Sequence, residues 1–141
     1  MNRFVVDASV AIKWWVPEVH SADALRYLDP DVGREAPELL LAEAGNILWK
    51  KVNRGELTRA EAERIAADLV RSDVVIYPVG PLLVASLRIA LETGRSSYDC
   101  TYLALAEAIT AAVVTADRKL YNSLQGGPYA GLVRWVEDPG L

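Results

Sequence analysis

The sequence predicts an α/β protein, a three-layer α/β/α sandwich around a central and largely parallel sheet. Short β-branched runs that suit buried strands alternate with longer segments of helical periodicity along the chain. Apolar residues make up 52% and charged residues 24% of the sequence, which fits a compact fold with helices covering the sheet. The length of 141 residues suits one domain, so we expect residues 1–141 to fold as a single unit.

The first half of the chain predicts two strands and four helical segments. Pro17 stops the first helical segment, an Asp29-Pro30-Asp31 turn follows the second, and Gly55 closes the third. Thr58 and Glu61 have the spacing of a capping box at the start of the fourth. The expected elements are a strand at 3–6, helices at 8–16 and 21–28, a strand at 32–36, and helices at 37–53 and 58–72.

The second half continues the alternation of strands and helices. Gly94 lies just beyond one helix, and a Gly126-Gly127-Pro128 turn precedes the last strand. The expected elements are a strand at 74–79, helices at 81–93 and 98–110, a strand at 112–115, a short helix at 118–124 and a last strand at 132–136. Ligands of such parallel sheets bind beyond the carboxyl ends of the strands, where the strand order reverses.

The composition excludes several classes of site. The single cysteine, Cys100, rules out an internal disulfide and a cysteine-based zinc cluster, and the single histidine, His20, rules out paired-histidine chemistry. Asp7 and Lys13 interrupt the apolar start of the chain, so we expect no signal peptide, no membrane association and a cytoplasmic location. The net charge of −4 argues against a large basic face for nucleic acid without excluding a nuclease.

Four acidic residues, Asp7, Glu43, Asp99 and Asp117, lie within or beside apolar runs, where a carboxylate needs compensation. The runs are Phe4-Val5-Val6, Leu39-Leu40-Leu41-Ala42, Tyr102-Leu103-Ala104-Leu105-Ala106 and Ala111-Ala112-Val113-Val114. Three of the acids have ordinary alternatives: Asp7 and Asp117 suit helix N-caps, and Asp99 suits a capping box with Ser96.

Glu43 has no such alternative. It lies at the margin of the apolar stripe of its helix, and neither Lys nor Arg occupies the positions three or four residues away. Asn46 shares its side of the helix and could hydrogen-bond the acid or a water molecule.

Convergence of these acids would require a cation. Two carboxylates about 4 Å apart repel by roughly 4 kcal/mol at an effective dielectric near 20. Ligation by oxygen alone favours Mg²⁺ or Mn²⁺ over zinc, and such an ion can polarise a phosphoryl oxygen and activate water. Hydrolysis of a phosphodiester is the reaction that fits these residues.

Hydroxyl and basic side chains near the acids supply candidate supporting groups. Ser9 and Thr115 stand two residues from Asp7 and Asp117 and could orient a carboxylate or water, while helix capping and strand propensity explain them equally well. Basic residues close to the acids in sequence could hold RNA phosphates or could be plain surface charges; they are Lys13, Arg95, Arg118 and Lys119.

Four motifs in order carry a family resemblance: Val5-Val6-Asp7-Ala8-Ser9, Glu43-Ala44-Gly45-Asn46, Ser97-Tyr98-Asp99-Cys100-Thr101-Tyr102-Leu103-Ala104-Leu105-Ala106 and Val114-Thr115-Ala116-Asp117-Arg118-Lys119-Leu120. The chain resembles the PIN-domain ribonucleases over essentially its whole length, and most closely the VapC toxins of type II toxin–antitoxin pairs. The resemblance implies a PIN-like fold, a Mg²⁺- or Mn²⁺-dependent endoribonuclease site, RNA as substrate, a cognate antitoxin and a homodimer.

Carried over by position, Asp7, Glu43, Asp99 and Asp117 match the catalytic and metal-binding acids of the family, and Thr115 matches their hydroxyl neighbour. Some relatives carry a further acid shortly after the last of these, whereas here none follows until Glu137. The resemblance therefore leaves open whether one or two metal ions bind.

Three other functions are alternatives for an α/β chain with these acids. A phosphoacceptor receiver domain expects an adjacent acid pair after the first strand and a lysine after a late one, and a haloacid-dehalogenase-like phosphatase expects a second acid where Ser9 stands. The motifs around Asp7 and Asp117 supply neither pattern. The third alternative is a catalytically inactive PIN-like binding module, for which Glu43 has no purpose.

Overall fold

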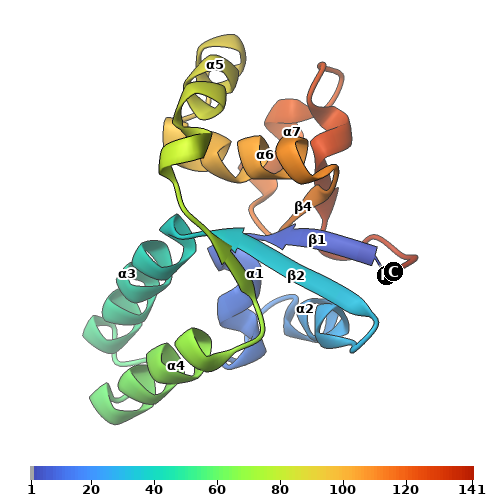
Figure 1. Cartoon of the computed structure of the whole chain (residues 1–141). Helices are drawn as coiled ribbons and strands as arrows, with labels where there is room; N and C mark the ends of the chain where they lie inside the picture. The colour runs from blue at the N-terminus through green and yellow to red at the C-terminus, as the bar shows by residue number, and fades with distance from the viewer. Residues whose placement is uncertain (1) are drawn as a thin grey trace.

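Within residues 2–141, the part of the chain that the computed structural model describes, five strands form one sheet in the order β3-β2-β1-β4-β5 (Figure 1). All four neighbouring pairs are parallel, as the sequence predicted. The strands are β1 (Asn2–Val6), β2 (Val32–Pro37), β3 (Val75–Tyr77), β4 (Ala112–Thr115) and β5 (Val133–Trp135).

The central strand β1 joins the two halves of the sheet. It pairs with β2 on one side, where Val5 lies opposite Glu35, and with β4 on the other, where Val5 lies opposite Val113. The chain builds outward from β1 to β3 and then returns to add β4 and β5 on the opposite side. The strand order therefore reverses between β1 and β4, which is where parallel sheets bind ligands.

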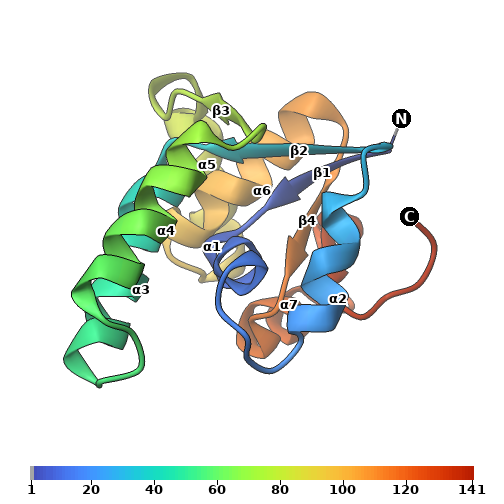
Figure 2. The same ribbon diagram turned by 90° about the horizontal axis from the view of Figure 1, so that it is seen from below.

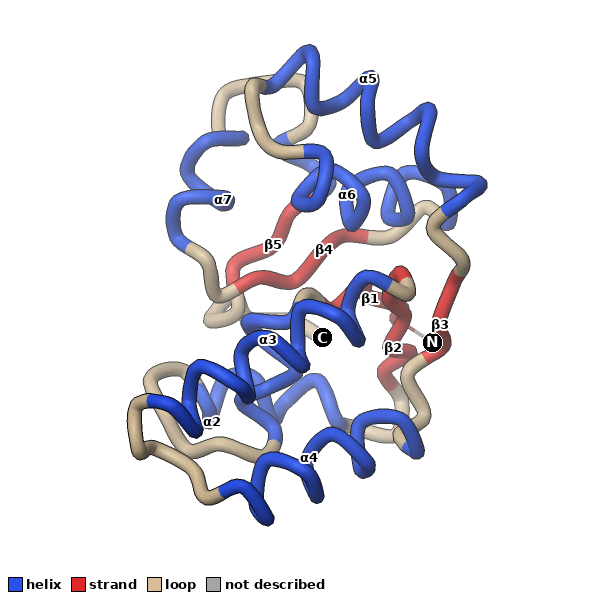
Figure 3. Tube along the Cα trace, turned by 90° about the vertical axis from the view of Figure 1, so that its left-hand side faces the viewer, coloured by secondary structure: helices blue, strands red, loops and turns tan. Residues whose placement is uncertain are grey.

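Alternate residues of β1 face opposite helical layers. Phe4 and Val6 belong to one apolar cluster and Val5 to the other, so the strand is buried on both faces. The first layer, below the strands in Figure 3, contains the helices between β1 and β3. They are α1 (Ala8–Ala11), η1 (Ile12–Trp14), α2 (Ser21–Leu25), η2 (Arg26–Leu28), α3 (Leu39–Asn53) and α4 (Arg59–Arg71).

The second layer, above the strands in Figure 3, packs on Val5, Val113 and Val133. Its helices are η3 (Gly80–Leu82), α5 (Leu83–Thr93), α6 (Ser97–Ile109), α7 (Arg118–Leu124) and η4 (Ala130–Leu132). Cys100 is fully buried in this layer, as expected for a small apolar residue. The two layers and the sheet make the predicted α/β/α sandwich.

Most element boundaries lie within one or two residues of the sequence prediction, and two of the differences have a clear physical cause. Pro37 was expected to start a helix, but it ends β2, because the amide of Glu38 still bonds the carbonyl of Tyr77 in β3 at 2.8 Å. The helix α3 therefore begins at Leu39. The segment after Asp7 was expected as one helix, but it tightens into the 3-10 turn η1 before Pro17.

Local capping signals place the helix ends of α4 and α5. Thr58 and Glu61 form the predicted capping box, and Gly94 ends α5 in the left-handed region at φ +75°.

Asn2 and Leu141 line one surface depression, and Figure 2 shows both ends of the chain on the same side of the molecule. Among the described helices, none has the length and apolar character needed to cross a bilayer.

Candidate functional site

The four acids singled out in the sequence meet in one pocket of about 150 Å³ at the carboxyl ends of β1 and β4. Asp7 and Asp117 follow these two neighbouring strands. Glu43 reaches the pocket from α3 and Asp99 from α6, so both helical layers contribute. The pocket therefore occupies the position at which the strand order reverses.

Asp7 is the most deeply buried of these acids, with 8% of its surface exposed. Its Oδ1 accepts hydrogen bonds from the Ser9 hydroxyl at 2.5 Å and from the amide of Val10 at 3.2 Å. The pKa of Asp7 is raised to about 6, chiefly by burial and also by the nearby charge of Asp117, although hydrogen bonds from Ser9 and other neighbours oppose the shift. Asp7 is therefore a helix N-cap, as one interpretation of the sequence predicted, but the hydrogen bonds of the cap supply no positive charge to its carboxylate.

Two hydroxyls fix the ends of β1 and β4 relative to each other. Ser9 Oγ donates to Asp7 and also accepts from the amide of Ala116 at 3.1 Å. Thr115 is fully buried, and its Oγ1 accepts from the amide of Asp117 at 3.0 Å. Both hydroxyls hold the backbone and carboxylates that line the pocket, in the positions that the sequence suggested.

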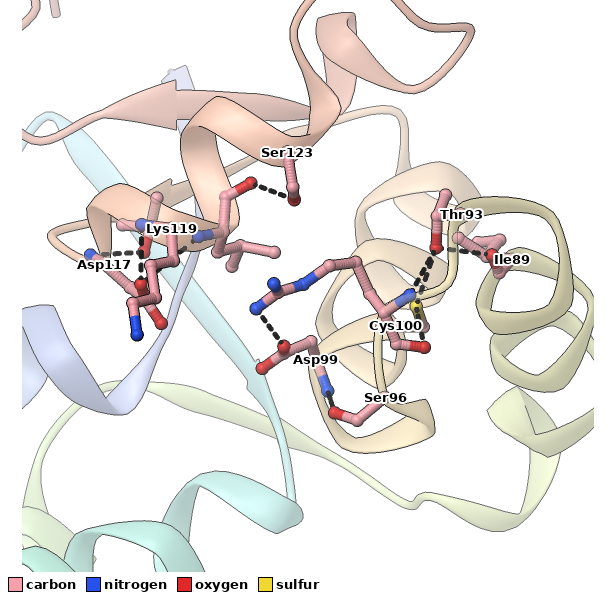
Figure 4. A network of polar contacts seen from close by, with 11 residues as sticks. Ile89, Thr93, Ser96, Asp99, Cys100, Asp117, Lys119 and Ser123 are labelled. Carbon is pink, nitrogen blue, oxygen red and sulfur yellow. Dashed lines mark hydrogen bonds and ion pairs between the residues drawn. The ribbon is translucent and has the colours of Figure 1, made fainter.

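Asp117 is at once a helix cap and a pocket residue. Its Oδ1 accepts from the amides of Lys119 and Leu120 at 3.0 and 3.2 Å, at the start of α7 (Figure 4). These amides hold one carboxylate oxygen. The other oxygen, Oδ2, accepts no hydrogen bond within residues 2–141, so capping does not occupy the whole group.

Glu43 has a partner that the sequence analysis missed. The hydroxyl of Tyr102, a residue with 3% exposure, donates to Glu43 Oε1 at 2.6 Å. Burial raises the pKa of Glu43 and the nearby Asp99 adds to the rise, while the Tyr102 hydrogen bond opposes it. Tyr102 lies three residues after Asp99 on the same side of α6, and that spacing was the available signal. The predicted partner Asn46 makes no bond to Glu43 in the described part of the chain.

Asp99 already pairs with a cation from its own chain. Arg95 Nη2 lies 2.8 Å from Asp99 Oδ2, and both side chains are about three-quarters buried. The amide of Asp99 bonds Ser96 Oγ at 3.2 Å, which caps α6 (Figure 4). Arg95 Nε is buried and has no partner within residues 2–141. Within residues 2–141, the guanidinium of Arg95 therefore hydrogen-bonds Asp99 and no other residue.

The other predicted basic residues are arranged differently. Lys13 pairs with Glu18 at 3.0 Å and does not line the acid pocket. Arg118 stacks on Trp135, with its guanidinium carbon 3.6 Å from the ring centroid. Lys119 is exposed at the start of α7 and has no ion-pair partner among the described residues. A role in RNA binding stays a prediction for all of them.

The donors in the acid pocket are carboxylate oxygens, which suit a hard cation such as Mg²⁺ or Mn²⁺. Burial is the main cause of the raised pKa values of Asp7 and Glu43, and neighbouring carboxylates add to it, so a cation in the pocket would stabilise their charged forms. Within residues 2–141, a tighter set of ligand atoms belongs to His20 and Asp23, which are half-buried, and to Glu137, which is exposed. The acid pocket offers four carboxylates, of which Asp7 is buried and Glu43 and Asp99 are half-buried, so a cation there offsets the cost of burying their charge.

Sequence comparison gives a consistent result. A family model described as the PIN domain matches residues 4–123. Ribonuclease VapC3 of Pyrobaculum aerophilum is 32% identical over 120 residues, covering 84% of this chain and 92% of the relative. Exonuclease VapC9 of the same organism is 36% identical over 88 residues, covering 62% of this chain and 65% of the relative.

A solved structure supports the same fold. The crystal structure of PAE2754 from Pyrobaculum aerophilum superposes with a TM-score of 0.68 at 27% identity. The match covers 96% of this chain and 85% of the other. The whole sandwich, including the strands that carry Asp7 and Asp117, is thus shared with that protein.

Proposed function

The chain belongs to the PIN domain family, and on that premise we propose that it is a divalent-metal-dependent endoribonuclease, the toxin of a toxin–antitoxin pair. One observation carries the proposal: four carboxylates from four separate segments line a single pocket at the reversal of strand order. Both P. aerophilum relatives are named as nucleases, one a ribonuclease and one an exonuclease. RNA is therefore the proposed substrate, and residues 1–141 the proposed catalytic unit.

The residues of the pocket have different roles in the proposed reaction. Mg²⁺ or Mn²⁺, when bound, supplies polarisation of a phosphoryl oxygen and a water of lowered pKa. Asp7, Asp99 and Asp117 hold the ion, and Glu43 either joins them or positions the attacking water. Ser9 and the first amides of α7 fix two of these carboxylates, which limits their reorganisation during the reaction. Attack by water leaves 5′-phosphate and 3′-hydroxyl ends.

The direct test is cleavage of total RNA by the purified protein with Mg²⁺ or Mn²⁺, with and without chelator. We expect cleavage with either ion and none in chelator. The surface variant Asp68→Asn, which alters an ion pair with Arg71 on α4, serves as the matched control and should cleave normally. Cleavage that survives chelation would exclude the metal mechanism, and absence of cleavage under all conditions would favour the inactive binding module.

Endonuclease and exonuclease activity separate on circular RNA, because a circle has no end. We expect the circle to be opened and then shortened, as an endonuclease requires. A circle that persists while the same linear RNA is degraded from its end would show an exonuclease, in line with the name of one relative.

Arg95 should compete with the metal for Asp99, since its guanidinium already neutralises that carboxylate. Arg95→Met is expected to tighten Mn²⁺ binding about fivefold, because a positive charge beside the site is removed. Titration of the paramagnetic resonance signal of free Mn²⁺ measures this, with Arg88→Met as a control that breaks the exposed pair with Glu107. Weaker Mn²⁺ binding in Arg95→Met would instead mean that Arg95 holds Asp99 in place for the ion.

A cognate antitoxin and a homodimer complete the proposal, with the cytoplasm, where RNA is made and used, as the place of action. Aliphatic side chains on one side of α5 are exposed and suit a contact with a second copy; they are Leu83, Val84, Leu87 and Leu91. The charged residues of α5 instead bond within the chain, Arg88 to Glu107 and Glu92 to Tyr129. Light scattering of the purified protein is expected to give twice the 15.4 kDa chain mass; a monomer mass would contradict the dimer.

A further inference from the structure

A groove of about 410 Å³ adjoins the acid pocket and has no role in the mechanism above. It lies between α3 and the start of α6, and Glu43 and Ile47 line both cavities. We call it the Tyr98 groove, after the residue that closes it on the α6 side. An RNA strand placed with a phosphate among the four acids would continue directly into it.

Tyr98 presents an aromatic ring to solvent at this position. It directly precedes Asp99, and 67% of its surface is exposed, whereas Tyr102 one turn later is buried. A large exposed ring beside a nuclease pocket suits stacking of an unpaired base, which is how proteins commonly hold single-stranded RNA. The position of Tyr98 next to a pocket acid places such a base close to the scissile phosphate.

The α3 side of the groove carries polar groups suited to a nucleotide. Asn46 offers an amide donor and acceptor, and Lys50 offers a positive charge, one helical turn apart. Within residues 2–141, neither side chain has a hydrogen-bond or ion-pair partner. The adjacent Lys51, by contrast, pairs with Glu18 at 2.8 Å. In a chain of net charge −4, an unpaired lysine in the groove next to the acid pocket complements the negative charge of an RNA phosphate.

We propose that the Tyr98 groove binds the nucleotide next to the scissile phosphate, with its base stacked on Tyr98, its edge facing Asn46 and its phosphate near Lys50. This inference rests on the proposed ribonuclease function and names the part of the RNA that the protein grips. The groove holds single-stranded RNA, because a base must be unpaired to stack on the ring. Tyr98 and Lys50 are binding residues and take no part in the proton or phosphoryl transfer.

The test measures binding of fluorescein-labelled 12-nucleotide oligouridylate and oligoadenylate, by anisotropy, to protein carrying Asp7→Asn so that the RNA stays intact. Adding Tyr98→Ala is expected to raise Kd about tenfold, and Tyr98→Phe should leave Kd within about twofold, because stacking needs the ring and not the hydroxyl. Lys50→Ala should reduce the slope of log Kd against log salt concentration by about 0.7, the value for one phosphate contact to a single strand. Trp49→Ala is the matched control, an aromatic residue with 61% exposure that lines a different groove between α3 and α4.

The outcomes separate this inference from the function on which it rests. An unchanged Kd in Tyr98→Ala overturns the inference, and this is the result expected if the groove binds a protein partner instead of RNA. Equal weakening of RNA binding by Trp49→Ala also overturns it. If the otherwise native protein cleaves RNA while Tyr98→Ala changes neither binding nor cleavage, the ribonuclease function stands and only the groove proposal fails. If the Asp7→Asn protein does not bind RNA and the wild-type protein does not cleave it, the ribonuclease function and the groove proposal fail together.

Discussion

Asp7→Asn is expected to reduce RNA cleavage by about a thousandfold or more while making the metal-free protein more stable. Loss of a carboxylate ligand removes several kcal/mol of charge stabilisation in the transition state, and each 1.36 kcal/mol is tenfold in rate. Stability moves the opposite way because the pKa of Asp7 is raised to about 6 in the folded protein. The folded state then binds the proton more tightly than the unfolded state does.

The sign of the pH dependence follows from that shift. Below the unfolded pKa of 3.8, Asp7 is protonated in both states and costs nothing; as pH rises through 6, the folded protein must carry a buried charge. The cost at pH 7 is at most about 3 kcal/mol, and Asn removes it. Urea denaturation in chelator should therefore show the wild-type chain losing stability relative to Asp7→Asn between pH 4 and pH 7.

Two results would contradict this account of Asp7. A variant that is less stable than wild type at pH 7 would mean that the charge, held by Ser9 and Val10, is worth more than its burial costs. A variant that still cleaves RNA at a comparable rate would remove Asp7 from the metal site. Asp68→Asn on the surface of α4 again provides the control for both measurements.

Tyr102→Phe is expected to lower metal affinity or cleavage rate by about ten- to a hundredfold, the usual effect of removing a group that orients a metal-site residue. The hydroxyl is the donor to Glu43 Oε1, and without it the pKa of Glu43 rises further. The charged form of Glu43 is then less stabilised, and its carboxylate is less firmly oriented toward the ion. Mn²⁺ titration and the rate of RNA cleavage measure the two effects separately.

Tyr129→Phe is the matched control for that variant. Tyr129 also donates its hydroxyl to a glutamate, Glu92, but this pair lies away from the acid pocket. Its removal should leave metal binding and cleavage unchanged. Equal activity of wild type and Tyr102→Phe would show that Glu43 is held by packing alone.

Most of the fold was predictable because the start and end of each strand and helix depend mainly on residues nearby in the sequence. The β-branched runs, the Thr58 and Glu61 capping box and the Gly94 helix end are local signals, and the structure confirms them. Pro37 misled because its fixed geometry suits a strand end as well as a helix start, and pairing with Tyr77 of β3 decides between the two. That pairing joins residues far apart in the sequence.

In the candidate site, too, local features were predictable from the sequence, whereas contacts between distant segments were not. Unusual carboxylates in apolar runs identified the acids that line the pocket, since misplaced charge is visible residue by residue. The spacing within α6 places Tyr102 on the same side as Asp99, but its contact with Glu43 spans two helices and depends on how they pack. Arg95 and Asp99, four residues apart, were predictable as an ion pair by spacing alone, but Arg95 was interpreted as an RNA ligand or a plain surface charge.

The position of β1 between β2 and β4 also sets when the protein can become active. During synthesis Asp7 is made early, yet the Ala116 amide that donates to Ser9 and the carboxylate of Asp117 are made only after β1, β2, β3 and β4. A nascent chain that stops before β4 has no complete pocket. We therefore expect a nascent chain to cut RNA only after β4 and Asp117 have been made and have joined β1.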